Sequence, residues 1–197
     1  MSHPGSPGHL RCPALSVIIP VDGGLRARRG RAPAALTTVL TAEDVDRAIC
    51  SVLDQSVRDL EVLAVVEAPR GRDAVDAQAP PVSALRRLSV RDRRVRLMPA
   101  ADIAAAVRAA RAPLLTVLDP RDVVVAGAYE AMTSRLAASG AHAVVGAVRR
   151  PGGADPTGSW PSGSHARVED VLDAVEDPLA GRLVARTRLC QDRKSVV

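Results

Sequence analysis

Aromatic residues are almost missing from this sequence, which has no phenylalanine, one tryptophan (Trp160) and one tyrosine (Tyr129) among 197 residues. Apolar residues nevertheless make up 47% of the chain, which is typical of a globular protein and not of a disordered one. The core must therefore be built from Val, Leu, Ala and Ile. At this length the chain can bury one well-formed domain and is too short for two full ones.

Cysteine is scarce as well. Cys12, Cys50 and Cys190 are odd in number and far apart, which excludes a disulfide framework and a zinc-finger spacing. We place Cys50 on the apolar side of a predicted helix, as a small hydrophobic residue. The first residues lack the apolar stretch of a signal peptide, and no run reaches the roughly 20 apolar residues of a membrane span. These absences predict a cytoplasmic protein, with peripheral attachment as the one form of membrane association left open.

Charge is unbalanced toward the positive, with a formal net charge of +5. Such a charge favours polyanionic partners: diphosphates, teichoic-acid-like polymers, anionic membrane surfaces or nucleic acid. Proteins that bind single-stranded nucleic acid usually place aromatic side chains among the basic ones to stack the bases. The arginine-rich stretches at 26–31 and 91–96 contain no aromatic residue. We therefore expect no nucleic-acid partner.

Short apolar runs alternate with helical patterns along the chain. The runs LSVIIP, LEVLAVV and LLTVL are apolar almost throughout, as is typical of strands buried on both faces. Thr41 and Asp44 form a capping pattern before a helix whose apolar residues recur at helical spacing through Leu53. Strands are predicted at 15–20, 60–66, 95–98, 114–118 and 142–148, and helices at 41–53, 82–89, 102–111 and 126–139.

This alternation predicts the α/β class, with an open, mainly parallel sheet and helices on both faces. We expect 1–13 to be a flexible tail, 14–150 the folded domain, and 151–197 a linker with a helical C-terminal segment. The side chains that we expect to be buried in the core are Ile18, Val52, Leu63, Leu97, Val117 and Val145.

Two stretches resemble the opening of the family 2 glycosyltransferases, which have the GT-A fold. Residues 16–20 read SVIIP, and residues 51–62 read SVLDQSVRDLEV. The family typically has S-V-I-I-P, then S-V-L-x-Q-[ST] at the end of a helix and D-L-E-V leading into the second strand. The later strands follow in the family's order, so that the likeness covers roughly residues 14–149.

The resemblance implies a nucleotide-sugar-binding domain over 14–150. It further implies the transfer of a sugar from a nucleotide-diphosphate sugar to an acceptor hydroxyl. Residues 166–189 loosely resemble domains that are fused to glycerophosphotransferases of wall-polymer synthesis. The expected acceptor is therefore a carbohydrate or a polyol-phosphate, in cell-wall or surface polysaccharide synthesis.

The motifs that carry the family's chemistry are altered here. After its first strand the family has Tyr-Asn, and this chain has Asp22 there. After its second strand the family has D-D-G-S, of which this chain keeps a single acidic residue, Glu67. In the family's metal-binding D-x-D motif, the first aspartate corresponds to Asp119 and the second to Arg121, and Asp122 follows directly. The resemblance implies that Asp22, Glu67, Asp119 and Arg121 bind the nucleotide and that Asp119 and Asp122 bind Mg²⁺ or Mn²⁺. Because parallel strands bring their carboxyl ends to one edge, we expect one shared cleft. No catalytic base is identified.

Arg121 has two interpretations. A guanidinium repels a divalent cation and forks onto a phosphate, which predicts nucleotide binding that depends only weakly on metal. Alternatively, Pro120 sets a turn, Asp122 caps the following helix, and Arg121 projects into water or pairs with a neighbouring carboxylate. The same choice extends to function, since the chain is either a glycosyltransferase or a catalytically inactive GT-A domain that binds a polyanion or a partner protein.

Overall fold

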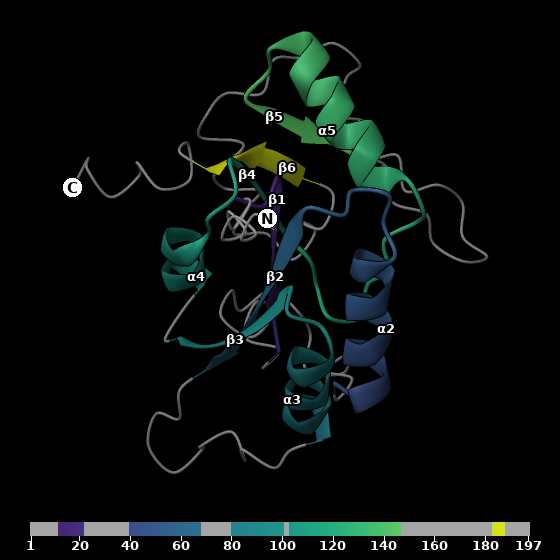
Figure 1. Ribbon diagram of the computed structural model, residues 1–197, viewed down its shortest axis with the longest axis vertical. Coiled ribbons are helices and arrows are strands. Elements are labelled where there is room, and N and C mark those ends of the chain that lie inside the picture. Colours follow the sequence, from purple (N-terminus) through teal and green to yellow (C-terminus); the bar gives the residue numbers. More distant parts are fainter. Residues whose placement is uncertain (1–11, 22–39, 68–79, 101–102, 147–182, 188–197) are drawn as a thin grey trace, which may run out of the picture.

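The computed structural model describes residues 12–21, 40–67, 80–100, 103–146 and 183–187 (Figure 1). In chain order the elements in these ranges are β1 (Leu15–Pro20), α2 (Ala42–Leu53), β2 (Leu60–Glu67), α3 (Pro80–Arg91), β3 (Val95–Ala100), α4 (Ile103–Ala109), β4 (Leu114–Val117), α5 (Ala128–Ser139), β5 (Ala143–Val145) and β6 (Leu183–Arg186).

The strands form one sheet in the order β3-β2-β1-β4-β6-β5. β1 pairs in parallel with β2 on one side and with β4 on the other, and β2 pairs in parallel with β3. A helix lies in the chain between β1 and β2 and another between β2 and β3, because two parallel neighbours need a long crossover. The predicted α/β class with a mainly parallel sheet is confirmed.

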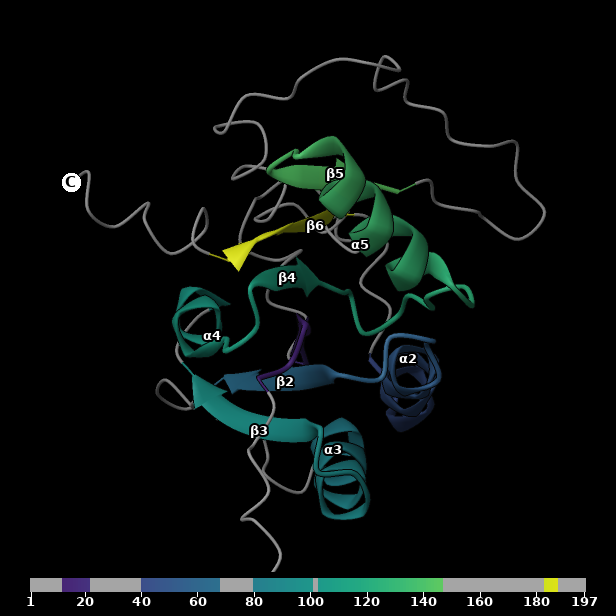
Figure 2. The same cartoon turned by 45° about the horizontal axis from the view of Figure 1, so that its top comes forward.

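Helices cover both faces of the sheet, as predicted. Figures 1 and 2 show α2, α3 and α5 on one side and α4 on the other. Side chains of β1 alternate between two apolar cores: Val17 and Ile19 pack with α2, α3 and α5, whereas Ile18 packs with α4. Burial on both faces explains why the strand sequence LSVIIP has no polar alternation.

Most of the predicted core is buried. Four of the six chosen side chains are at most 2% exposed, namely Ile18, Val52, Leu63 and Val117. Leu97 is only partly buried and packs against the core, because β3 is the last strand at one edge of the sheet. The side chain of Val145 lies outside the described residues. Cys50 is exposed and not on the apolar side, since it lies about 100° further round α2 than the buried Ile49.

β6 was not predicted. It lies between β4 and β5 and pairs antiparallel with both, within the segment where we expected a linker and a helix. Thr187 (4% exposed) follows it: the side chain donates to the carbonyl of Ala112 (2.6 Å), and the N–H donates to the carbonyl of Pro113 (2.9 Å). These bonds hold the end of β6 beside the start of β4. The helix expected around 168–175 lies outside the described residues.

Two helices have ends that the sequence predicted. At the start of α2, the Thr41 hydroxyl accepts the Asp44 N–H (3.1 Å), and the Asp44 carboxylate accepts the Thr41 N–H (3.1 Å). This is the capping box. α5 ends at Gly140, whose φ of 67° is in the left-handed region that glycine favours.

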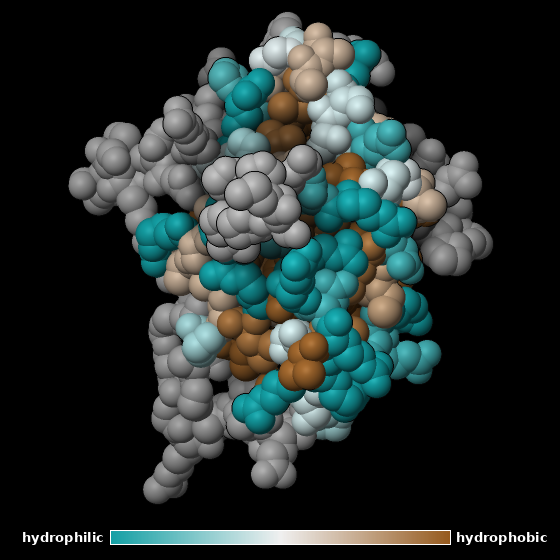
Figure 3. Space-filling model, viewed as in Figure 1, coloured by the Kyte–Doolittle hydropathy of each residue, from teal (hydrophilic) through white to brown (hydrophobic). Residues whose placement is uncertain are grey.

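The surface is mixed in polarity. On the face drawn in Figure 3, hydrophilic residues predominate among the coloured atoms and apolar ones lie between them in small groups. Among the residues that the structure describes, the exposed large hydrophobic side chains are Val90, Val123 and Val125. Within the described ranges, no helix has both the length and the apolar character that crossing a membrane requires.

Candidate functional site

The carboxyl ends of three parallel strands meet at one edge of the sheet. Pro20 of β1 pairs with Val65 of β2, and Ile18 of β1 pairs with Val117 of β4, so the three strands run level toward this edge. Glu67 is the last residue of β2, and Asp119 follows β4 by two residues. The backbone therefore brings positions 67 and 119 to the same edge. Asp22 and the side chain of Glu67 lie outside the described residues.

A tight turn carries Asp119 and Arg121. The carbonyl of Asp119 accepts the N–H of Asp122 (2.9 Å), and its carboxylate accepts the N–H of Arg121 (2.9 Å). Aspartate at the first position and Pro120 at the second favour a β-turn, since the carboxylate bonds to the backbone two residues on and proline fixes φ. The sequence predicted this turn. The predicted helix cap at Asp122 is wrong, because α5 begins at Ala128.

Arg121 pairs with the carboxylate of the same turn. Its guanidinium lies 3.7 Å from Asp119 Oδ1, in an ion pair whose carboxylate side chain is 4% exposed and whose arginine side chain is 26% exposed. A charge so far out of water needs a partner, and the Arg121 side chain supplies one. Of the interpretations given above, pairing with a neighbouring carboxylate is the one observed.

The charge of Arg121 also acts on the first turn of α2. The pKa of the Asp44 carboxyl lies below its ordinary value, mainly because the Thr41 hydroxyl and N–H bond to it. The positive charges of Arg47 and Arg121 lower it further. The start of α2 thus lies within electrostatic reach of Arg121. Sequence reasoning did not place α2 at this site, although a helix that follows β1 must start at the carboxyl edge.

The described residues do not fit a strongly held divalent ion. Among them, no group of three or more His, Cys, Asp and Glu side chains could hold a metal. Asp119 Oδ1 already has a guanidinium beside it, and a second cation at the same oxygen is opposed by that charge. Asp122, the other expected ligand, is exposed. The expectation of Mg²⁺ or Mn²⁺ at these two residues therefore stays a prediction, and we expect the ion to bind there only weakly.

Ser51, in the last turn of α2, and Gln55, just after the helix, hold the segment that follows the Asp119 turn. The buried Gln55 side chain (1% exposed) donates to the carbonyls of Ser51 (3.1 Å) and Val125 (3.0 Å) and, more weakly, of Val124 (3.4 Å). Its oxygen accepts the N–H of Tyr129 at the start of α5 (3.3 Å). The hydroxyl of Ser51 accepts the N–H of Val124 (3.0 Å).

Ser51 and Gln55 are residues whose role sequence reasoning missed. Both belong to the SVLDQS motif that carries the resemblance, so the signal was present in the sequence. What the sequence does not show is that their partners are 69 to 74 residues further along the chain.

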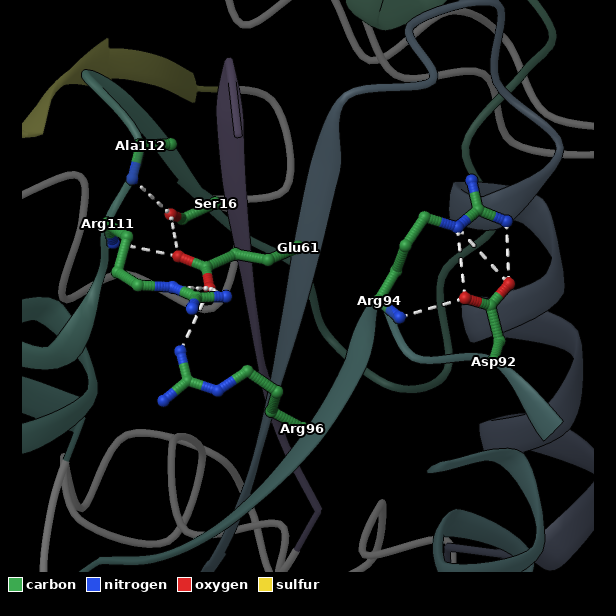
Figure 4. A network of polar contacts seen from close by, with 7 residues as sticks. All are labelled: Ser16, Glu61, Asp92, Arg94, Arg96, Arg111 and Ala112. Atoms are coloured by element: carbon green, nitrogen blue, oxygen red, sulfur yellow. Dashed lines mark hydrogen bonds and ion pairs between the residues drawn. The ribbon is translucent and has the colours of Figure 1, made fainter. Parts of the chain in front are cut away.

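A second polar cluster surrounds the carboxylate of Glu61 (Figure 4). Glu61 is 2% exposed and accepts hydrogen bonds from the Ser16 hydroxyl (2.8 Å), the Arg111 N–H (2.8 Å) and side chain (3.0 Å), and the Arg96 guanidinium (2.9 Å). The Ala112 N–H in turn donates to the Ser16 oxygen (3.1 Å). Ser16 and Glu61 lie near the amino ends of their strands, away from the edge with Asp119.

The Glu61 cluster is satisfied and structural in character. Burial by itself raises the pKa of the Glu61 carboxyl. The hydrogen bonds from the Arg111 N–H, Ser16 and Arg96, together with the charge of Arg111, outweigh it, so the pKa lies below its ordinary value. The cluster joins β1, β2, β3 and the start of β4. It keeps Glu61 ionised and gives it no proton to exchange at neutral pH.

Comparison with known proteins gives matches in structure only. No family model matches the chain, and no curated protein matches it in sequence. Among solved structures, it resembles a mannosyltransferase from Pyrobaculum calidifontis in complex with GDP-Man and Mn²⁺, with a TM-score of 0.50 and 19% identity. That match covers 72% of this chain and 37% of the mannosyltransferase.

The chain also resembles residues 1–349 of TarS from S. aureus. The complex with UDP-GlcNAc gives a TM-score of 0.60 at 11% identity and covers 91% of this chain and 47% of that fragment. The complex with UDP gives 0.58 at 11% identity and covers 91% of this chain and 48% of the fragment. The chain thus spans less than half the length of these neighbours. At such low identity they show the fold alone: an α/β fold of the GT-A type, as found in glycosyltransferases.

Proposed function

We propose that this protein is glycosyltransferase-like and that its GT-A domain binds a nucleotide-diphosphate sugar at the carboxyl edge of β1, β2 and β4. The observation that carries the proposal is the turn after β4, which holds a buried Asp119 and a paired Arg121 at that edge. Open α/β sheets bind ligands at this edge. The two neighbours described above, crystallised with GDP-Man and with UDP-GlcNAc, support the same class of ligand.

The proposed roles follow from charge and position. Arg121 contacts the diphosphate, because a planar guanidinium presents several N–H donors that match phosphate oxygens. Asp119 orients Arg121 and, with Asp122, is the proposed ligand of a weakly bound metal. Asp22 and Glu67, at the ends of β1 and β2, are proposed for the base and ribose. The sugar passes to a hydroxyl of a carbohydrate or polyol-phosphate in cell-wall or surface polysaccharide synthesis.

Weak dependence on metal is part of the proposal. In a metal-dependent site the ion neutralises the leaving diphosphate. Here the guanidinium of Arg121 already lies at 3.7 Å from Asp119 Oδ1 and brings a permanent positive charge to this position. We therefore expect Mg²⁺ or Mn²⁺ to change nucleotide affinity by less than about tenfold.

The same ion pair favours a second candidate function. If the charge of Arg121 is fully used by Asp119 and by the nearby Asp44, little remains for a phosphate. The domain would then be a catalytically inactive GT-A domain that binds a polyanion or a partner protein through its other basic residues. The two candidates differ in one measurable property, the binding of free nucleotide diphosphates.

Isothermal titration calorimetry decides between these candidates. UDP, GDP and CDP are titrated into the protein, each with and without Mn²⁺. We expect one of them to bind without the metal, and we expect Arg121→Gln to weaken that binding. Arg135→Gln is the matched control, since it removes the same charge from an exposed position on α5. Failure of all three nucleotides to bind under both conditions would refute the proposal and favour the inactive domain.

A further inference from the structure

Gln55 links α2 to the segment that follows the Asp119 turn. Its side chain is 1% exposed, and both its amide nitrogen and its amide oxygen form hydrogen bonds with backbone atoms. One of its partners, the carbonyl of Val125, belongs to the stretch between the turn and α5, and another, the N–H of Tyr129, belongs to the first turn of α5. Ser51, one helical turn earlier, holds the N–H of Val124 in the same stretch.

This stretch has no regular structure of its own to fix it. It runs from the Asp119 turn to α5, which starts after Gly127 and has no side-chain cap. Gln55 takes the place of that cap by accepting the N–H of Tyr129. The carbonyls of Val124 and Val125 are outside helix and strand, and both accept a hydrogen bond from the Gln55 side chain; the Val125 carbonyl also accepts the N–H of Ala128 (3.1 Å). One end of the segment is therefore anchored by β4 and the other by Gln55.

We propose that Gln55 is a positioning residue for the turn from Asp119 to Asp122, and through that turn for the Arg121 guanidinium. Only two residues separate Arg121 from Val124, and each residue spans at most about 3.6 Å of extended chain. If Val124 and Val125 shift, the short connection therefore moves the turn from Asp119 to Asp122 as well. That Arg121 contacts a diphosphate rests on the proposed function. That Gln55 holds the turn does not.

Amide hydrogen exchange, followed by NMR residue by residue, tests the first step without any ligand. In Gln55→Met, which keeps the side-chain volume but removes the amide, we expect about tenfold faster exchange at the N–H of Asp122, as lost hydrogen bonds lower the local opening free energy. The N–H of Leu118, bonded to Ile18 at the end of β4 (2.9 Å), is the internal reference. Equal exchange at Asp122 in wild type and Gln55→Met overturns the inference.

Two control variants separate positioning from general destabilisation. Ser56→Ala removes a neighbouring exposed bond to Glu130 (2.6 Å) and leaves the Gln55 contacts intact. Leu136→Ala destabilises the core from the far end of α5, where the side chain is 2% exposed. We expect neither variant to change Asp122 exchange relative to the Leu118 reference. If Leu136→Ala speeds it as much as Gln55→Met does, the effect is a loss of global stability and the inference is wrong.

A double-mutant cycle tests the second step on whichever of UDP, GDP and CDP binds the wild type. Arg121→Gln is measured in the wild-type and Gln55→Met backgrounds. We expect the loss of affinity to be at least about threefold smaller in the second background, because residues that act through one another are not additive. Additive effects contradict the link to Arg121. A wild type that binds no nucleotide refutes the proposed function instead, and the exchange measurement then still decides whether Gln55 holds the turn.

Discussion

Replacing Glu61 with alanine is the perturbation whose cost the structure defines best. The carboxylate is 2% exposed and receives hydrogen bonds from Ser16, Arg96 and Arg111. The side chains of Arg96 and Arg111 are 37% and 55% exposed and can turn to water, so that the loss of their ion pairs with Glu61 costs little. The Ser16 hydroxyl is buried and the Arg111 N–H is fixed by the backbone, so both lose their acceptor, and a buried donor left without an acceptor costs about 1–3 kcal/mol.

We therefore expect Glu61→Ala to lower the free energy of unfolding by about 3 kcal/mol, and the melting temperature by about 6–12 °C. Glu61→Gln keeps an oxygen for Ser16 and the Arg111 N–H, but it loses the charge and replaces the acceptor of the two exposed arginine side chains with an amide NH2, so we expect about 1–2 kcal/mol. Urea unfolding followed by circular dichroism measures both values. Equal losses in the two variants would show that charge, and not the buried acceptor, stabilises this part of the sheet.

The Glu61 cluster also makes stability depend on pH. Because the folded-state pKa of Glu61 is below its ordinary value of 4.5, the stability that its ionisation provides is complete above that pH. It is lost as the pH falls below 4.5 toward the folded-state pKa. The difference in stability between wild type and Glu61→Gln should therefore shrink on acidification below this pH. If the difference in unfolding free energy stays constant from pH 7 to pH 3, ionisation of Glu61 is not its origin.

The remaining predictions concern single positions. Thr41→Ala removes the capping box of α2 and should cost about 1 kcal/mol of unfolding free energy, whereas Glu43→Ala, in the same turn, should cost less; equal costs would count against the cap. Gly127→Ala should cost about 1–2 kcal/mol from its φ of 76° alone, since no atom lies within 4 Å of the added carbon, and an unchanged denaturation midpoint would refute this. Val117→Asp buries an unpaired charge worth several kcal/mol, about the total stability of a domain, so a soluble variant that melts cooperatively would contradict the core position of β4.

Local patterns in the sequence determine the central part of the fold. β1, β2 and β4 are runs of apolar residues, and α2 has both a capping box and a continuous apolar face, so that their types and approximate limits follow from the residues themselves. β6 has no such signal. Its four residues become a strand because β4 and β5 lie on either side, and this depends on contacts about 40 to 70 residues away in the chain.

The candidate site divides in the same way. The turn at Asp119 follows from an aspartate and a proline in consecutive positions, and the edge of the sheet follows from parallel strands. The choice between interpretations of Arg121 required the three-dimensional structure, since the pairing with Asp119 depends on the conformation of the turn and the effect on Asp44 depends on where the turn lies relative to α2. The part played by Gln55 could not be predicted from its neighbours in sequence, because its partners follow β4.

The central claim is that Arg121 supplies at this edge the positive charge that a metal ion supplies elsewhere. The variant Arg121→Asp tests it, since it removes the guanidinium and creates a D-x-D pattern with Asp119. Calorimetric titration of UDP, GDP and CDP, with and without Mn²⁺, compares it with wild type. We predict that the variant loses metal-free binding by about 10- to 100-fold, the value of a charge-assisted hydrogen bond, and binds nucleotide only when Mn²⁺ is present. Identical binding by wild type and Arg121→Asp under both conditions would contradict the claim.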